Sequence, residues 1–170
     1  MADQKALTDR MHEDPNPYIH WPAGYTPGAA DLFVHNERFI NAAPSTVWRH
    51  LVEAPKWPEW YPNSQAVGLL TEPSDVLQKD SRFEFDTFGT HIAATIDEFE
   101  PERRLGWFGF GTDITAYHTW LLIPLAEGCQ VVTEVVAKGP GAVAIREPDP
   151  EALYKGHDLW LSRLKQLSER

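Results

Sequence analysis

Six runs of strand-like composition follow one another from residue 65 onward, with no helical segment between them. Turn-forming stretches such as PSD, TFGT, EPER and AEG separate the runs, which lie at about 65–71, 81–87, 91–99, 104–110, 113–123 and 129–138. Successive strands that are joined by short turns pair side by side and antiparallel. We therefore expect one antiparallel sheet, built as a meander.

The last segment, PDPEALYKGHDLWLSRLKQLSER, has the composition of a long amphipathic helix. Asp149 suits the N-cap, Pro150 suits the first helical position, and basic residues are concentrated late. Apolar residues and one histidine recur on a single stripe, formed by Leu153, His157, Trp160, Leu164 and Leu167. We expect this helix to lay that stripe on the sheet.

The stretch before the meander is typical of a strand, a short helix and a bent helical turn. LFVHNERFI has strand composition, and Pro44 in NAAPSTVWRHLVEA fits the first position of a helix. Prolines interrupt the following PKWPEWYPN, whose Trp57, Trp60 and Tyr61 need either burial or a ligand. Two alternatives are open for these aromatics: they close one end of a cavity, or they stack on a bound molecule.

A chain of 170 residues has the size of one domain. We expect a single domain over 31–170 and an extended arm over 1–30, because PNPYIHWPAGYTPG cannot run as a helix or a central strand. The arm either packs Tyr18, Trp21 and Tyr25 on the domain, or contacts a partner or covers a pocket mouth. GPGAVAIREPDP, before the last helix, is expected to be a flexible connection that serves as a plain linker or a cavity rim.

The balance of charge excludes several classes of partner. Twenty-five acidic and fifteen basic residues give a net charge of −10, so we expect no binding to nucleic acid or to an anionic membrane surface. The first thirty residues hold no apolar run of seven, which argues against a signal peptide or membrane insertion. We expect a cytoplasmic protein that is a monomer or a homodimer.

The sequence contains no recognisable metal or cofactor motif. Its seven histidines show no H-E-x-x-H pattern, and GWFGFG lacks the G-x-G-x-x-G order and the following helix of a dinucleotide site. Bends or bulges in a curved sheet explain those glycines better. Cys129, the only cysteine, is expected to be a structural thiol, with a nucleophilic role as the alternative. We predict that the protein uses no cofactor and no metal.

Alternation along the strands predicts which side chains point inward. In SRFEFDT and HIAATID the charged residues mark the outer face, so Phe83, Phe85 and Ile96 point to the core. Trp107 is expected to follow them inward from the next strand. These residues give the sheet an aromatic inner face.

The register of the last two strands depends on the AEG turn. If that turn pairs them, Trp120 lies opposite Thr133 and His118 lies opposite Val135, all on the inner face. A slip of one residue would instead bring in the alternate set, Tyr117, Thr119 and Leu121. The first register adds two polar groups to an otherwise apolar wall.

A concave, mostly apolar wall with sparse polar groups is what a small-molecule cavity requires. We expect a hydrophobic small molecule to be held between the sheet and the last helix. The predicted ligand-binding residues are Trp60, Tyr61, Phe83, Phe85, Ile96, Trp107, His118, Trp120, Thr133, His157 and Trp160.

Three stretches of the chain resemble the START-related, Bet v 1-like superfamily (SRPBCC), especially its polyketide cyclase/dehydrase and lipid-transport branch. They are APSTVWRHLVEAPKWPEWYP, IDEFEPERRLGW, and HTWLLIPLAEGCQVVTE with the terminal helix, and the resemblance covers about residues 32–170. It implies an α+β helix-grip fold: a curved seven-stranded antiparallel sheet around a long C-terminal helix, with two short helices after the first strand. This fold hosts many functions and does not choose among them.

Three functions fit this resemblance and the residues. The leading one is binding of a lipid- or polyketide-like molecule. The second is a polyketide cyclase/dehydratase-like enzyme with His118 as general base, because aldol-type cyclisation needs little beyond a base, an oxyanion donor and an apolar pocket. His118 and His157 have the same alternative reading, as core histidines. The third is an Hsp90-activator-like protein-binding module, although that branch usually has WWGP where this chain reads EWYPN.

Overall fold

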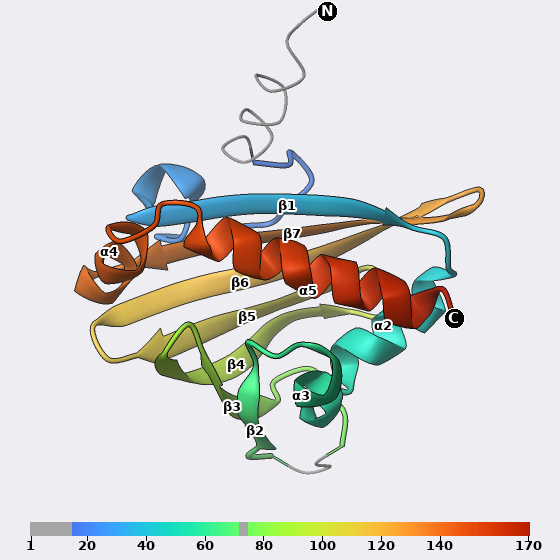
Figure 1. Ribbon diagram of the computed structural model, residues 1–170, viewed down its shortest axis with the longest axis horizontal. Coiled ribbons are helices and arrows are strands. Elements are labelled where there is room, and N and C mark those ends of the chain that lie inside the picture. The colour runs from blue at the N-terminus through green and yellow to red at the C-terminus, as the bar shows by residue number, and fades with distance from the viewer. Residues whose placement is uncertain (1–14, 72–74) are drawn as a thin grey trace, which may run out of the picture.

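The structure, a computed structural model, describes residues 15–71 and 75–170, which form one curved antiparallel sheet with helices on its concave face (Figure 1). The seven strands lie in the order β1-β7-β6-β5-β4-β3-β2, so the predicted meander runs from β2 to β7 and β1 returns beside β7. The strands are β1 (Leu32–Ile40), β2 (Gln65–Leu69), β3 (Arg82–Thr87), β4 (Thr90–Glu100), β5 (Arg104–Gly111), β6 (Ile114–Leu125) and β7 (Gly128–Lys138).

The helices follow the order that the resemblance implied, with further short elements added. Helix α2 (Pro44–Val52), the 3-10 turn η2 (Ala54–Lys56) and the short α3 (Trp57–Trp60) come between β1 and β2. Helix α5 (Ala152–Ser168) lies along the concave face of the sheet, as Figure 1 shows. The structure therefore has the helix-grip architecture, and a further 3-10 turn, η1 (Pro27–Ala29), precedes β1.

The segment before α5 was expected to be a flexible connection, but it contains helix α4 (Pro140–Arg146). Gly139 makes the sharp change of direction possible, because its φ of +102° is accessible to glycine and to few other residues. The backbone N–H of Gly141 then donates to the carbonyl of Asp113, which fixes the start of α4 to the β5–β6 turn.

Helix α5 begins two residues later than the sequence suggested. The carboxylate of Asp149 accepts a hydrogen bond from the backbone N–H of Glu151 and another from Lys155 Nζ, so it caps a turn that leads into the helix. The prediction of Asp149 as the N-cap is therefore wrong: the N-cap is Glu151, whose side chain makes no capping hydrogen bond, and the first helical residue is Ala152 and not Pro150.

The predicted register of β6 and β7 is confirmed: Trp120 pairs with Thr133, and His118 pairs with Val135. The one-residue slip does not occur, because Tyr117 lies on the outer face and donates a hydrogen bond to Asp97. A bulge shifts the pairing of β4 with β5 next to Gly106, and a Cβ atom there would overlap the Tyr117 hydroxyl. This is the role expected of a glycine in a curved strand.

Described residues of the predicted arm pack on the convex face of the sheet. Ile19 packs on Leu121 and Val132, Trp21 meets Tyr117 edge-on, and Tyr25 meets Phe108 edge-on. Tyr18, which was also predicted to pack there, is 66% exposed. Residues 1–14 of the arm lie outside the described ranges, and the boundary at residue 30 stays a prediction.

Candidate ligand-binding site

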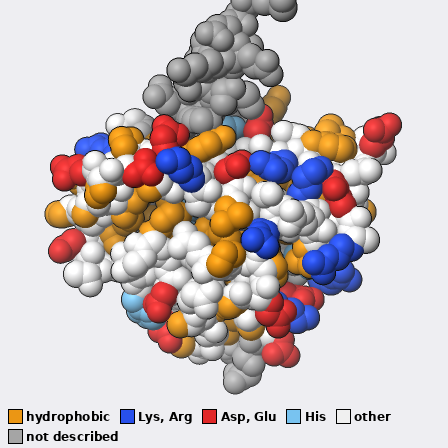
Figure 2. Space-filling view, viewed as in Figure 1, with side chains coloured by type: hydrophobic (Ala, Val, Ile, Leu, Met, Phe, Trp, Pro, Cys, Tyr) orange, Lys and Arg blue, Asp and Glu red, His pale blue; other side chains and the backbone are white. Residues whose placement is uncertain are grey.

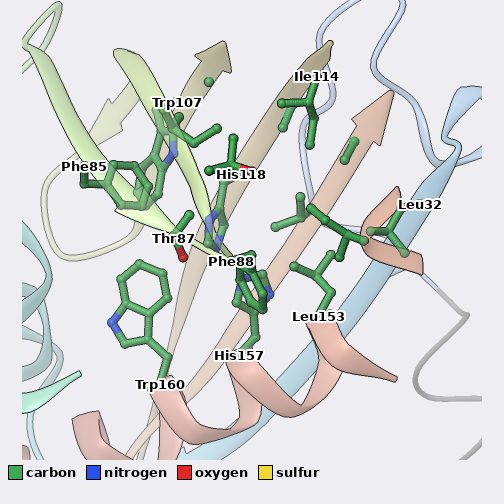
Figure 3. Close-up of a pocket in the computed structure, with 17 residues that line it drawn as sticks. Leu32, Phe85, Thr87, Phe88, Trp107, Ile114, His118, Leu153, His157 and Trp160 are labelled. Carbon is green, nitrogen blue, oxygen red and sulfur yellow. The ribbon is translucent and has the colours of Figure 1, made fainter. Parts of the chain in front are cut away.

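A cavity of about 70 Å³ lies between the concave face of the sheet and helices α4 and α5 (Figure 3). Its wall is almost entirely apolar and is contributed by β1, β3 to β7, the β3–β4 turn and both helices. The lining residues are Leu32, Phe85, Thr87, Phe88, Thr90, Ile92, Trp107, Gly109, Ile114, Ala116, His118, Val135, Ala137, Ile145, Leu153, His157 and Trp160.

The space exists because small residues line up across the sheet. Gly109 pairs with Ala116, and Ala116 pairs with Ala137, so three neighbouring strands present almost no side-chain volume in one row. The next row along, which contains Trp107 and His118, carries large rings. Helix α5 packs against the row of large rings and therefore cannot also reach the row of small residues. A void remains above the small residues, near the α4 end of α5.

The opposite end of the inner face is filled by stacked and edge-on aromatic rings. The Trp57 ring lies 5.2 Å from that of Trp160 and 5.9 Å from that of Phe83, both nearly perpendicular. The ring of Tyr61 stacks on Trp160 at 4.4 Å, and its hydroxyl donates to the carbonyl of Gly156. These contacts leave no space for a ligand between the rings, so this end acts as a packed wall.

Phe88 lies at the tip of the two-residue turn between β3 and β4 and covers part of the cavity. Phe88 and Gly89 both have positive φ, which is the conformation of a tight hairpin but is uncommon for phenylalanine. The Phe88 ring meets His157 edge-on at 5.7 Å, and Figure 3 shows it in front of His157. Asn63 accepts a hydrogen bond from the backbone N–H of Phe88 and donates one to Tyr61, tying the hairpin to the packed wall.

The space-filling view shows the outer surface over this region. Hydrophobic side chains are visible on the left, near α4, whereas most Lys and Arg side chains in view lie to the right, toward the C-terminal half of α5 (Figure 2). The cavity lies beneath the less basic end of this face.

Two buried histidines bring imidazole rings to the wall of the cavity. His118 comes from β6 and His157 from α5, and their ring centroids are 4.9 Å apart. Burial lowers the pKa of His118 well below its ordinary value, and the neighbouring His157 lowers it further. Burial also lowers the pKa of His157, to about 3. Both imidazoles are therefore neutral near pH 7.

Comparison with known proteins places the chain in a family. Residues 33–169 match the family described as polyketide cyclase/dehydrase and lipid transport. The chain belongs to this family. A hypothetical protein from Helicobacter pylori with a solved structure is 31% identical, with a TM-score of 0.83 over 91% of this chain and 98% of that one. None of the curated proteins matches the chain.

Solved structures with lower sequence identity share the fold of this chain. An aromatase/cyclase from a Streptomyces species is 17% identical, with a TM-score of 0.65 over 81% of this chain and 93% of that one. A START superfamily protein from Mycobacterium smegmatis is 14% identical, with a TM-score of 0.59 over 79% and 98% of the two chains. These likenesses show the helix-grip fold.

Five of the ligand-binding residues predicted from the sequence lie together on the wall of the cavity. They are Phe85, Trp107, His118, His157 and Trp160. Phe83, Ile96 and Trp120 face the same side of the sheet but are enclosed by other side chains in the core. Their side chains point to the inner face, as the alternation predicted. Their position along the strands places them at the end of the inner face that aromatic rings fill.

The remaining three predicted residues lie behind the wall or away from it. Tyr61 is buried behind Trp160, and Thr133 is buried behind His118. Trp60 lies in a separate open groove of about 500 Å³, together with Arg49 and Arg170. Trp60 is directed there because α3 is a single turn, on which Trp57 takes the inward position.

Sequence reasoning missed the residues that bound the open part of the cavity. Ile92, Val135 and Leu153 were on the inward face but were not singled out, and Phe88 was treated as part of a turn. A usable signal was the row of small residues, since Gly109 and Ala116 occur in strands that otherwise carry large side chains. Small residues at facing positions indicate where a core is not filled.

Other candidate chemistry finds little support among the described residues. Burial raises the pKa of the Cys129 thiol to about 11, so the thiolate nucleophile is scarce at neutral pH. In residues 15–71 and 75–170, no group of three His, Cys, Asp or Glu side chains is arranged to hold a metal ion. Within the same ranges, no helix has the length and apolar character needed to cross a membrane.

Proposed function

We propose that this protein binds a hydrophobic small molecule in the cavity between its sheet and helix α5. The observation that carries the proposal is the wall itself, which is apolar on all sides and offers few polar atoms. Apolar concave sites of this kind bind molecules chiefly by removing their surface from water, and the few polar atoms orient them. Membership of a family that includes lipid-transport proteins supports the same function.

The size of the cavity adds a condition to this function. A cavity of about 150 Å³ is known to hold a molecule as small as benzene, whereas this one measures about 70 Å³. A lipid- or polyketide-like ligand therefore has to widen the space as it binds. Phe88 is the lining residue best placed to move, because it belongs to a two-residue turn and not to the packed sheet.

A neutral fluorescent probe tests this function directly. N-phenyl-1-naphthylamine, whose emission rises in apolar surroundings, is expected to bind with a saturable increase in fluorescence. Ala116→Phe places a ring in the cavity and should abolish that increase. Ala93→Phe is the matched control, because Ala93 is exposed on the outer face of β4. Equal binding by both variants would place the probe elsewhere and contradict the proposal.

A second measurement identifies what the protein carries in the cell. Native mass spectrometry of gently purified protein is expected to show an added mass that disappears under denaturing conditions. The same measurement on Ala116→Phe should show the chain alone. A retained mass in that variant would mean that the molecule is held outside the cavity.

A cyclase- or dehydratase-like activity is the second candidate, and the neutral His118 favours it. As general base, His118 would remove a proton from the carbon beside one ketone; that carbon attacks a second ketone, and the resulting alkoxide takes up a proton before water is lost. Heptane-2,6-dione is a suitable probe, because its cyclic enone product absorbs ultraviolet light. His118→Phe should reduce any protein-dependent turnover by about 10²- to 10⁴-fold. Turnover that this variant retains would exclude His118 as the base.

The remaining predictions from the sequence stay predictions. They are the Hsp90-activator-like alternative, the cytoplasmic location, the absence of nucleic acid and of cofactors, and the state as monomer or homodimer.

A further inference from the structure

The hydrogen bonds around Thr133 determine which nitrogen of His118 carries the proton. Thr133 has one hydroxyl proton, and it donates this proton to the carbonyl of Thr119 at 3.1 Å. Its oxygen lies 2.7 Å from His118 Nε2 and must therefore accept from that nitrogen. A neutral imidazole with its proton on Nε2 has a lone pair on Nδ1. His118 Nδ1 is thus a hydrogen-bond acceptor.

This acceptor is open to the cavity. In the part of the chain that the structure describes, His118 Nδ1 makes no hydrogen bond, and it is not sealed by packing either. His118 lines the cavity, and Figure 3 shows it pointing from β6 toward α5. A molecule in the cavity therefore meets a lone pair on this ring.

His157 supplies the complementary group. Its Nδ1 is fully buried and has no partner among the described residues. A buried N–H without an acceptor is rarer and more costly than a buried lone pair without a donor, so the proton belongs on Nε2. Nε2 is not sealed by packing, and His157 lines the cavity. The second histidine thus presents a donor.

The charge of the wall narrows the ligand class. None of the seventeen lining residues, all within the described ranges, is Lys or Arg. Burial keeps both histidines neutral near pH 7, as their lowered pKa values indicate. A carboxylate in this cavity would be buried without a positive partner, which is strongly unfavourable.

We infer that His118 and His157 together form an anchor for a hydroxyl group, and that the ligand is a neutral apolar molecule carrying an alcohol or phenol. The hydroxyl donates to His118 Nδ1 and accepts from His157 Nε2. Rings with centroids 4.9 Å apart can both reach one oxygen at ordinary hydrogen-bond distances. Thr133 acts as a positioning residue, because it sets the tautomer of His118. This inference rests on the proposed binding function.

Four small probes of one ring system test the inference: 1-naphthol, naphthalene, 1-methoxynaphthalene and 1-naphthoate, each titrated against the bound N-phenyl-1-naphthylamine. Naphthol is expected to bind at least about 10-fold more tightly than the other three. The methyl ether keeps an acceptor but has lost the donor, and the naphthoate carries the charge. In Thr133→Val the preference for naphthol over naphthalene should fall to about 2-fold, and Thr133→Ser should restore it.

Thr119→Val is the matched control, because Thr119 accepts the hydrogen bond from the Thr133 hydroxyl with its backbone carbonyl and not with its side chain. A readout independent of affinity is the ¹⁵N spectrum of His118, which should show the Nε2–H tautomer in the wild type and in Thr133→Ser. In Thr133→Val that assignment should be lost.

The outcomes separate the inference from the function on which it rests. If no probe binds, including N-phenyl-1-naphthylamine, the binding function itself is wrong. If all four naphthalenes bind with similar affinity, the cavity is a binding site and the hydroxyl anchor is wrong. Tightest binding of the naphthoate, or an Nδ1–H tautomer of His118 in the wild type, would also overturn the anchor.

Discussion

The ring of Phe88 occupies the space that a side chain on residue 156 would need, because a Cβ atom on Gly156 would overlap the tip of that ring. The β3–β4 hairpin and helix α5 therefore touch at a point where the helix has no side chain. Glycine within a helix costs about 1 kcal/mol relative to alanine, so its presence here has a packing reason. This contact closes the cavity beside His157.

A double-mutant cycle measures the contact. Gly156→Ala gains helix propensity but displaces Phe88, so its net effect on the free energy of unfolding should be zero or unfavourable. In a Phe88→Ala background the obstacle is gone, and the same change should stabilise the protein by about 1 kcal/mol. Urea denaturation of the four proteins provides the test. Equal effects of Gly156→Ala in both backgrounds would show that the two residues are not coupled.

Removal of the Phe88 ring should also accelerate ligand uptake. If the hairpin has to move before a ligand can fit, Phe88→Ala should raise the association rate of N-phenyl-1-naphthylamine by about 3- to 10-fold in stopped-flow fluorescence. Phe110→Ala is the control, since Phe110 is 48% exposed on β5 and does not line the cavity. An unchanged rate in Phe88→Ala would mean that the ligand passes elsewhere.

The inward faces of β3 and β4 could be predicted because each of these strands has one plainly polar face. The charges of Glu84 and Asp86 fixed the direction of Phe83 and Phe85. The short AEG turn favoured the register of β6 and β7 that is observed, while a slip of one residue stayed open from the sequence. Both inferences depend on the alternation of side chains along a strand, which has a period of two residues and can be recognised from neighbouring residues in the sequence.

The position of the cavity along the strands could not be predicted from this alternation. Alternation tells which side a residue faces, but it does not tell whether a neighbouring element fills the space in front of it. Trp120 is enclosed because Trp160 packs on it at 5.1 Å, whereas Ala116 on the same strand faces a void. That difference is decided by where α5 crosses the sheet, which is a property of the whole fold.

The two cavity histidines should make the protein less stable in mild acid. Below its ordinary pKa of 6.5, His157 takes up a proton in the unfolded chain but not in the folded one, where burial holds its pKa at about 3. The unfolded state then binds more protons, so the free energy of unfolding falls by about 1.4 kcal/mol per pH unit for this histidine. Its stabilising contribution is complete above about pH 6.5 and is lost toward pH 3.

The test compares urea denaturation at two pH values, about 7.5 and 5.5. His157→Phe should lose about 1.4 kcal/mol less than the wild type over this interval. His91 is a control of opposite sign, because Asp86 and Glu84 raise its pKa, so protonation favours the folded state. His91→Gln should therefore make the loss in acid larger. A wild-type loss that His157→Phe leaves unchanged would mean that burial does not lower the pKa of His157 in the folded protein.

The described part of the arm should depend on a buried carboxylate on the other face of the sheet. Glu134 is fully buried and accepts hydrogen bonds from His35 Nδ1 at 2.6 Å and from the backbone N–H of Asn16 at 2.7 Å. Glu134→Ala leaves both donors without an acceptor, and should cost about 3 kcal/mol or more in unfolding free energy. Hydrogen exchange in residues 16–25 should accelerate in the same variant.

Glu98→Ala is the matched comparison for this prediction, because it removes a second histidine–glutamate contact of 2.6 Å whose histidine, His20, is 63% exposed. Water can replace the lost partner there, so the cost should stay below about 1 kcal/mol. Glu134→Gln keeps an acceptor oxygen at the buried site and should lie between the two alanine variants. If Glu134→Ala and Glu98→Ala were equally stable, and exchange in residues 16–25 were unchanged, the buried carboxylate would not be what holds this segment on the sheet.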